Sequence, residues 1–97
     1  MNLYAILRRA GWRSGEELEG ASVRSARIAE EVMRGEVRWI RSYVLDETDG
    51  TVGTVCIYEA TGPEAIRKHA ALAGLPVDKI IAVSDTLVVN DDPAAAG

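Results

Sequence analysis

The sequence contains no phenylalanine, one cysteine and one histidine. Without Phe, the core must be filled by Leu, Ile, Val and Ala. The single thiol, Cys56, excludes a disulfide within the chain and cannot hold an iron–sulfur cluster. No C-x-x-C or H-x-H spacing occurs, so a metal site would have to combine residues that are distant in the chain. A G-x-S-x-G elbow and a glycine-rich phosphate loop are also absent, which leaves nucleophilic catalysis and phosphate binding without a motif.

A surplus of positive charge is also missing. Lys and Arg total 11 against 15 Asp and Glu, for a net charge of −4. This balance argues against nucleic acid and anionic membranes as partners. No apolar run is long enough to span a bilayer and no segment resembles a signal peptide, so we expect a cytoplasmic protein. At 97 residues, the chain should form one domain with a modest core.

Two capping signals mark the starts of two helices. Ser14 is followed three residues later by Glu17, and Thr61 is followed by Glu64 with Pro63 between them. Strand-like runs flank both helical patterns. The predicted elements are, in order, a strand over 2–9, a helix over 14–35, strands over 37–47 and 51–60, a helix over 63–73 and a strand over 78–89.

This βαββαβ order predicts a ferredoxin-like α+β fold. Right-handed crossovers place both helices on one face of a four-stranded antiparallel sheet with strand order 4-1-3-2. We assign residues 1–90 to a single ferredoxin-like domain and residues 91–97 to a flexible C-terminal tail.

The stretch VRWIRSYVLDE, residues 37–47, alternates like a strand and raises the question of which side faces the helices. Burying Arg41 under helices would place an unpaired charge in the core, which is costly. The alternation therefore predicts that small apolar residues face the helices, namely Ile40, Val44, Val55 and Ile57. The predicted helix-free face, a ligand-binding or dimer face, comprises Trp39, Arg41, Tyr43, Cys56 and Tyr58.

A face with several aromatic side chains and an arginine is typical of interface centres. A second copy of the same sheet is the simplest cover for it. We therefore predict a homodimer in which two sheets pack face to face as a dimeric α+β barrel.

Three motifs of the chain are distinctive: Trp39-x-x-Ser42-Tyr43, Cys56-x-Tyr58-Glu59-Ala60, and His69 followed by Gly74-x-Pro76. The segments that contain them resemble a family of small actinobacterial proteins of unknown function, whose best-described type is a nickel-binding, nickel-responsive protein. The resemblance covers roughly residues 3–89. It implies a ferredoxin-like fold, a dimer and the binding of nickel or another divalent metal. The family often has a histidine where this chain has Arg41, and arginine is not a metal ligand.

The residues with candidate chemistry each have a structural alternative. His69 is either a metal ligand or a half-buried histidine bonded to a nearby carbonyl or carboxylate. Cys56 is either a soft ligand or reactive thiol, or a small buried hydrophobe. Arg41 and Glu59 form either a clamp for an anionic ligand or a structural ion pair. The acidic turn, residues 46–50, is interpreted as solvated because it lacks the ligand pattern of a calcium loop.

The leading functional hypothesis is a non-enzymatic homodimeric protein that binds a small ligand, with nickel or another divalent metal as the candidate cofactor. One alternative is a cofactor-independent oxygenase or cyclase with a pocket lined by Trp39, Arg41 and Tyr43; a cavity of about 300 Å3 or more would favour it. A further alternative is a protein-interaction module that uses the edge strand over 37–47.

Overall fold

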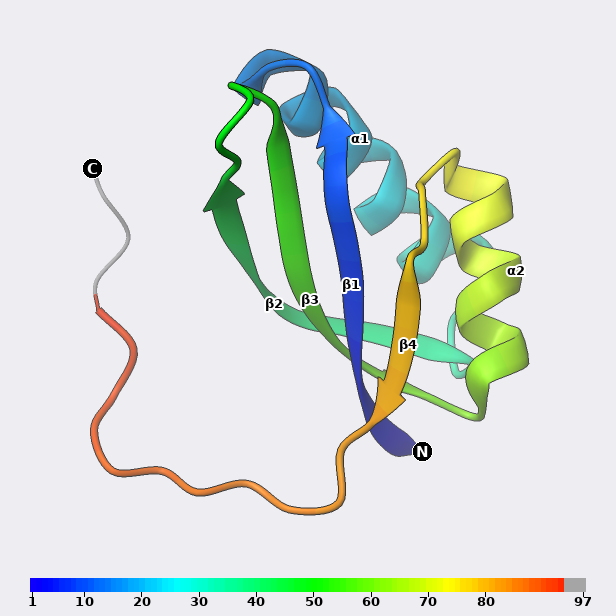
Figure 1. Ribbon diagram of the computed structural model, residues 1–97. Helices are drawn as coiled ribbons and strands as arrows, with labels where there is room; N and C mark the ends of the chain where they lie inside the picture. Colours follow the sequence, from blue (N-terminus) through cyan, green and yellow to red (C-terminus); the bar gives the residue numbers. More distant parts are fainter. Residues whose placement is uncertain (94–97) are drawn as a thin grey trace.

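The computed structural model describes residues 1–93, so residues 94–97 of the predicted tail lie outside it. A four-stranded sheet forms one layer and two helices form the other (Figure 1). In chain order the elements are β1 (Asn2–Trp12), α1 (Gly15–Arg27), a π-helical continuation η1 (Ile28–Val32), β2 (Val37–Asp46), β3 (Val52–Ala60), α2 (Pro63–Ala73) and β4 (Lys79–Ala82).

The sheet has the order β2-β3-β1-β4, and all neighbouring strands are antiparallel. Read from the opposite edge, this is the predicted 4-1-3-2. Both helices cover the same face of the sheet (Figure 1). The predicted four-stranded α+β fold is therefore confirmed within a single chain.

One of the two predicted helix caps is present. The Ser14 side chain accepts a hydrogen bond from the Glu17 backbone N–H at 3.2 Å, and α1 begins there. Helix α2 instead has Gly62 at its N-cap, with no side-chain cap, so the predicted role of Thr61 is wrong. Pro63 at the first helical position is enough to start α2, because its fixed φ is already helical and it has no N–H to satisfy.

Strand β4 is much shorter than the predicted strand over 78–89. It pairs with β1, and the last bond is donated by Val83 N to Leu3 O at 2.9 Å. Strand β1 has nearly reached its N-terminal end there, so the residues that follow Val83 directly find no further β1 residues to pair with. Residues 84–93, called here the C-terminal segment, continue without pairing.

A bulge in β2 decides which side chains face the helices. Trp39 pairs with Tyr58, but the next paired residue of β2 is Arg41, opposite Ile57, so Ile40 is an extra residue. Side chains that are opposite each other in a sheet lie on the same face. Trp39 therefore shares its face with Ser42, and its indole Nε1–H donates to Ser42 Oγ at 2.8 Å.

The predicted helix-free face is wrong for three of its five residues. Tyr58 and Cys56 are 1% and 5% exposed and lie under the helices, and Trp39 packs partly buried beside them. The prediction is right for Arg41 and Tyr43, which lie on the open face. Conversely, Ile40 and Ile57, predicted to be under the helices, line the open face, and Val55 lies opposite Tyr43 on that same face.

The acidic turn also differs from the prediction of full solvation. The Glu47 side chain is 9% exposed, pairs with Arg9 at 2.7 Å and accepts a hydrogen bond from Ala10 N at 2.7 Å. Gly53 makes this approach feasible, because a Cβ there would lie 2.8 Å from the Arg8 carbonyl oxygen and 3.1 Å from the Glu47 carboxylate. Glu47 thus anchors the irregular end of β1.

Candidate functional site

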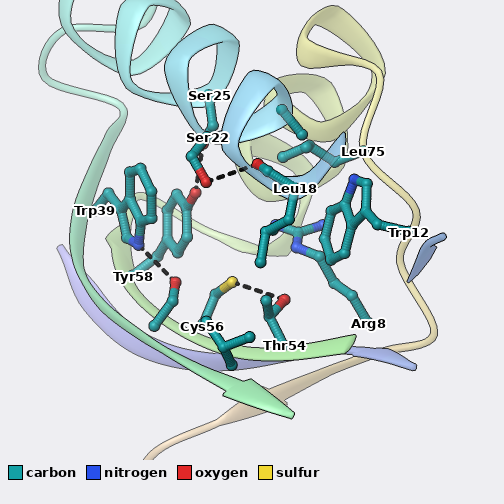
Figure 2. A pocket seen from close by; sticks show the side chains of 13 residues that line it. Arg8, Trp12, Leu18, Ser22, Ser25, Trp39, Thr54, Cys56, Tyr58 and Leu75 are labelled. Carbon is teal, nitrogen blue, oxygen red and sulfur yellow. Dashed lines mark hydrogen bonds between the residues drawn. The ribbon is translucent and has the colours of Figure 1, made fainter. Parts of the chain in front are cut away.

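A pocket of about 240 Å3 lies between the sheet and helix α1 (Figure 2). Strands β1, β2 and β3 supply its floor, α1 supplies the opposite wall, and Leu75 closes one side after α2. Trp39, Cys56 and Tyr58, which sequence analysis assigned to the open face, line this pocket instead. It also contains Arg8, which sequence analysis did not consider.

Aromatic rings form much of the pocket wall. The rings of Trp39 and Tyr58 are stacked, with centroids 6.0 Å apart and planes inclined by 10°. Trp12 lies on the opposite side and is 5% exposed. The bulge in β1 that places Trp12 there falls between Arg8 and Trp12. Both tryptophans of the chain therefore border the same space.

Three buried polar side chains connect the pocket to both helices. The hydroxyls of Tyr58 and Ser25 are 2.8 Å apart, and His69 Nε2 lies 3.4 Å from Ser25 Oγ and 3.0 Å from the Ser25 carbonyl oxygen. Because a carbonyl oxygen can only accept, Nε2 carries the proton. Nδ1 is then the unprotonated nitrogen, and it has no hydrogen-bond partner among residues 1–93.

Burial keeps these groups neutral. It lowers the pKa of His69, and the nearby positive charge of Arg8 lowers it further, against the opposing hydrogen bond to the Ser25 carbonyl. Burial also raises the pKa of Tyr58 to about 12. At neutral pH the chain of Tyr58, Ser25 and His69 is therefore uncharged.

Arg8 is the charged residue of the pocket and is 1% exposed. Its Nη1 donates to the Pro76 carbonyl oxygen at 2.6 Å, whereas its Nη2 is buried and has no hydrogen-bond partner within residues 1–93. No ion pair within residues 1–93 includes Arg8. The signal for its position was present in the sequence, since Tyr4, Ile6 and Arg8 alternate and so share one face of β1.

Cys56 lies on the pocket floor, with its Sγ 3.3 Å from Thr54 Oγ1. The two side chains are buried on the same face of β3. This environment is that of a small buried side chain with a hydroxyl partner.

The residues near His69 do not fit a nickel site. Among residues 1–93, no group of three or more His, Cys, Asp or Glu side chains comes together. Nε2 is committed to the Ser25 carbonyl, which leaves Nδ1 as the single candidate donor atom, near the cation of Arg8. A divalent ion at Nδ1 would lack the several anionic or imidazole ligands that nickel prefers.

The open face of the sheet carries a second hollow, of about 890 Å3, between the strands and the C-terminal segment. Figure 1 shows this segment leaving β4, passing clear of the sheet and returning on the β2 side. There Asp92 forms an ion pair with Arg41 and accepts a hydrogen bond from the Tyr43 hydroxyl at 2.9 Å. The predicted partner of Arg41, Glu59, pairs with Arg38 instead.

No helix within residues 1–93 has the length and apolar character needed to cross a membrane.

Comparison with known proteins gives a family and a fold. The family model described as "Nickel responsive protein SCO4226-like" matches residues 4–83. The crystal structure of SCO4226 from Streptomyces coelicolor A3(2) is similar, with a TM-score of 0.69 and 15% sequence identity, over 88% of this chain and 99% of that one. No curated protein matches the chain. At this identity the structural likeness concerns the fold alone.

Proposed function

The chain belongs to the SCO4226-like family of nickel-responsive proteins, and we propose that it is a small non-enzymatic protein that binds a ligand in the pocket between the sheet and α1. The observation that carries this proposal is a partly open pocket of about 240 Å3 whose inner wall is made of buried side chains, among them Trp12, Cys56 and Tyr58. A space bordered by two tryptophans, a tyrosine and several hydroxyls is suited to a small molecule with both apolar and polar parts.

The polar groups of the pocket favour binding over catalysis. A general base near Ser25 would need an unprotonated nitrogen facing its hydroxyl, but His69 Nε2 carries a proton that it donates to a carbonyl. Tyr58, with a pKa of about 12, does not ionise near neutral pH.

We exclude nickel from this pocket, because no three metal-ligating side chains come together within residues 1–93 and the nearby Arg8 is itself a cation. The family description concerns a response to nickel. For this chain, we assign the pocket to a small organic molecule and place no metal at His69.

We also propose that the protein is a homodimer formed through the open face and the C-terminal segment. Three consecutive aliphatic side chains of that segment, Leu87, Val88 and Val89, are 91%, 76% and 88% exposed. An exposed aliphatic run that has no strand partner within residues 1–93 favours pairing with another chain. The hollow of about 890 Å3 beneath the segment supports the same assembly, because a second copy would fill it.

A fragment screen tests the binding proposal directly. Trp12 and Trp39 are the two tryptophans of the chain and both line the pocket, so a 1H–15N spectrum contains two indole signals that both report on it. We expect small aromatic fragments of mixed charge to shift both signals saturably. A screen in which no fragment of any charge shifts either indole would refute the proposal.

A substitution that fills the space provides the matched test. Ala21 of α1 is fully buried and borders the pocket, whereas Val23 of the same helix is 67% exposed. Ala21→Leu should abolish the fragment-induced shifts, and Val23→Leu should leave them unchanged. Equal loss in both variants would indicate a general effect on α1.

A further inference from the structure

We propose that the ligand of this pocket is a monocarboxylate whose carboxylate pairs with Arg8. The inference rests on the proposed function, because it names the chemical class that the same pocket accepts. Its basis is the buried guanidinium of Arg8, in which Nη1 is bonded to Pro76 and Nη2 has no partner in the part of the chain that the structure describes.

The state of Arg8 is unusual for an arginine. A guanidinium stays protonated at any ordinary pH. Burying such a charge is unfavourable unless an anion pairs with it and its N–H groups are satisfied. The neighbouring residue provides a contrast, since Arg9 points outward and pairs with Glu47. The buried charge of Arg8 therefore calls for an anionic partner, and residues 1–93 do not supply one.

The groups that face Arg8 across the pocket do not neutralise it. Cys56, Thr54 and Tyr58 come from β3, and Ser22 and Ser25 come from α1; none is a carboxylate. Tyr58 is held in its neutral form. The pocket therefore has a net positive charge that an external anion would balance.

The charge of the site selects among anions. Arg8 is the one charged side chain among the residues that line the pocket, so the site matches a single negative charge. A phosphate monoester carries nearly two negative charges near pH 7 and normally requires several cations or backbone N–H groups. The two N–H groups on the edge of a guanidinium fit the two oxygens of a carboxylate. The geometry therefore favours a carboxylate over a phosphate.

The other lining residues indicate the chemistry of the rest of the ligand. Trp12, Trp39 and Leu18 offer apolar surface, while the hydroxyls of Ser22 and Thr54 offer hydrogen bonds (Figure 2). A pocket of about 240 Å3 suits a compact aromatic or branched aliphatic acid rather than a long-chain fatty acid.

Pairs of probes that differ only in charge test the proposal on the native protein. Benzoate, phenylacetate and cinnamate would each be titrated beside its primary amide, with the two indole signals as the readout. We expect at least one acid to bind about tenfold or more tightly than its amide, as charge-assisted hydrogen bonds do. Amides that bind as tightly as the acids would overturn the inference and leave the proposed function standing. If none of the six probes shifts an indole signal, the inference is overturned as well. The fragment screen then decides the proposed function separately.

Substitutions at neighbouring arginines provide the second arm. Arg8→Met should reduce the affinity for the best acid by about tenfold or more while changing that of its amide by less than about twofold. Arg9→Met is the matched control, since Arg9 lies next in the strand but outside the pocket, and it should change neither affinity. Unchanged acid binding in a folded Arg8→Met protein would contradict the assignment. If Arg8→Met does not fold, the acid and amide comparison on the native protein decides alone.

Discussion

The hydroxyl of Tyr58 lies 2.8 Å from the hydroxyl of Ser25, and this contact joins the C-terminal part of β3 to helix α1. Both groups are buried, and the same Ser25 also receives the Nε2–H of His69 from α2 at its carbonyl oxygen. One serine therefore connects the sheet to both helices at the rim of the pocket. A polar link of this kind fixes how the two layers sit on each other.

Removing the Tyr58 hydroxyl should destabilise the protein. Tyr58→Phe keeps the stack with Trp39 but leaves the buried Ser25 hydroxyl without this partner. We expect the free energy of unfolding to fall by about 1–3 kcal/mol, measured by urea denaturation. Tyr43→Phe removes an exposed hydroxyl bonded to Asp92 and should change it by less than about 0.5 kcal/mol. Equal effects in the two variants would argue against a structural role for the buried link.

His69 should make stability depend on pH in a defined window. Burial lowers its pKa in the folded state below the ordinary value of 6.5, so the folded protein favours neutral His69. As the pH falls through 6.5, the unfolded chain binds a proton that the folded chain does not yet bind. The free energy of unfolding therefore has its full value above about pH 7 and decreases below 6.5 until the lowered pKa is reached.

Urea denaturation between about pH 8 and pH 5.5 would measure this decrease. The chain has one histidine, so the attribution is direct. His69→Gln should flatten the profile in that window, because the acidic side chains titrate at lower pH. A profile of His69→Gln as steep as that of the native protein would show that another group is responsible.

The sequence was informative where local chemistry decides the structure. The capping box of Ser14 and Glu17 and the position of Pro63 placed both helices correctly, and the order of elements then left few topologies. It was misleading at β2, because one extra residue at Ile40 reverses the alternation beyond it. Nothing in VRWIRSYVLDE marks that bulge, so simple alternation places Trp39 on the wrong face.

The candidate site was predictable in one part and not in another. The alternation of Tyr4, Ile6 and Arg8 in β1 already indicated that an arginine lies under the helices. The cost of burying an unpaired arginine therefore bears on Arg8 as well as on Arg41. Whether the guanidinium of Arg8 finds partners is decided by residues far away in the chain, which no local pattern shows. Pro76, the partner of Nη1, is 68 residues away.

Nickel binding, at whatever affinity it is measured, should not depend on His69. Nε2 is bonded to the Ser25 carbonyl, and no cluster of three metal-ligating side chains exists in residues 1–93. Calorimetric titration of Ni2+ into His69→Ala should therefore match the native protein within about twofold, as expected for a side chain that contributes no ligand bond. A loss of about tenfold or more in the variant would place His69 among the ligands and contradict our exclusion of nickel from the pocket.

The oligomeric state tests the role of the C-terminal segment. Light scattering on the native protein should give about twice the chain mass of 10.4 kDa at micromolar concentration, because the aliphatic run 87–89 is nearly fully exposed in the single chain. Replacing Leu87 and Val89 together by Asp places two charges in the proposed interface and should give a monomer. Val23→Asp adds a charge to the exposed side of α1 and should leave the dimer intact.

A native mass near 10.4 kDa would refute the dimer without affecting the pocket, which is formed within one chain. If the variant with both aspartates is still a dimer, the interface does not involve residues 87–89. Cutting the chain after Val83 then separates the remaining options, since β4 keeps its bond to Leu3 and the sheet stays complete. If the shortened protein remains a dimer, the open sheet face alone forms the interface, with Arg41 and Tyr43 released from Asp92.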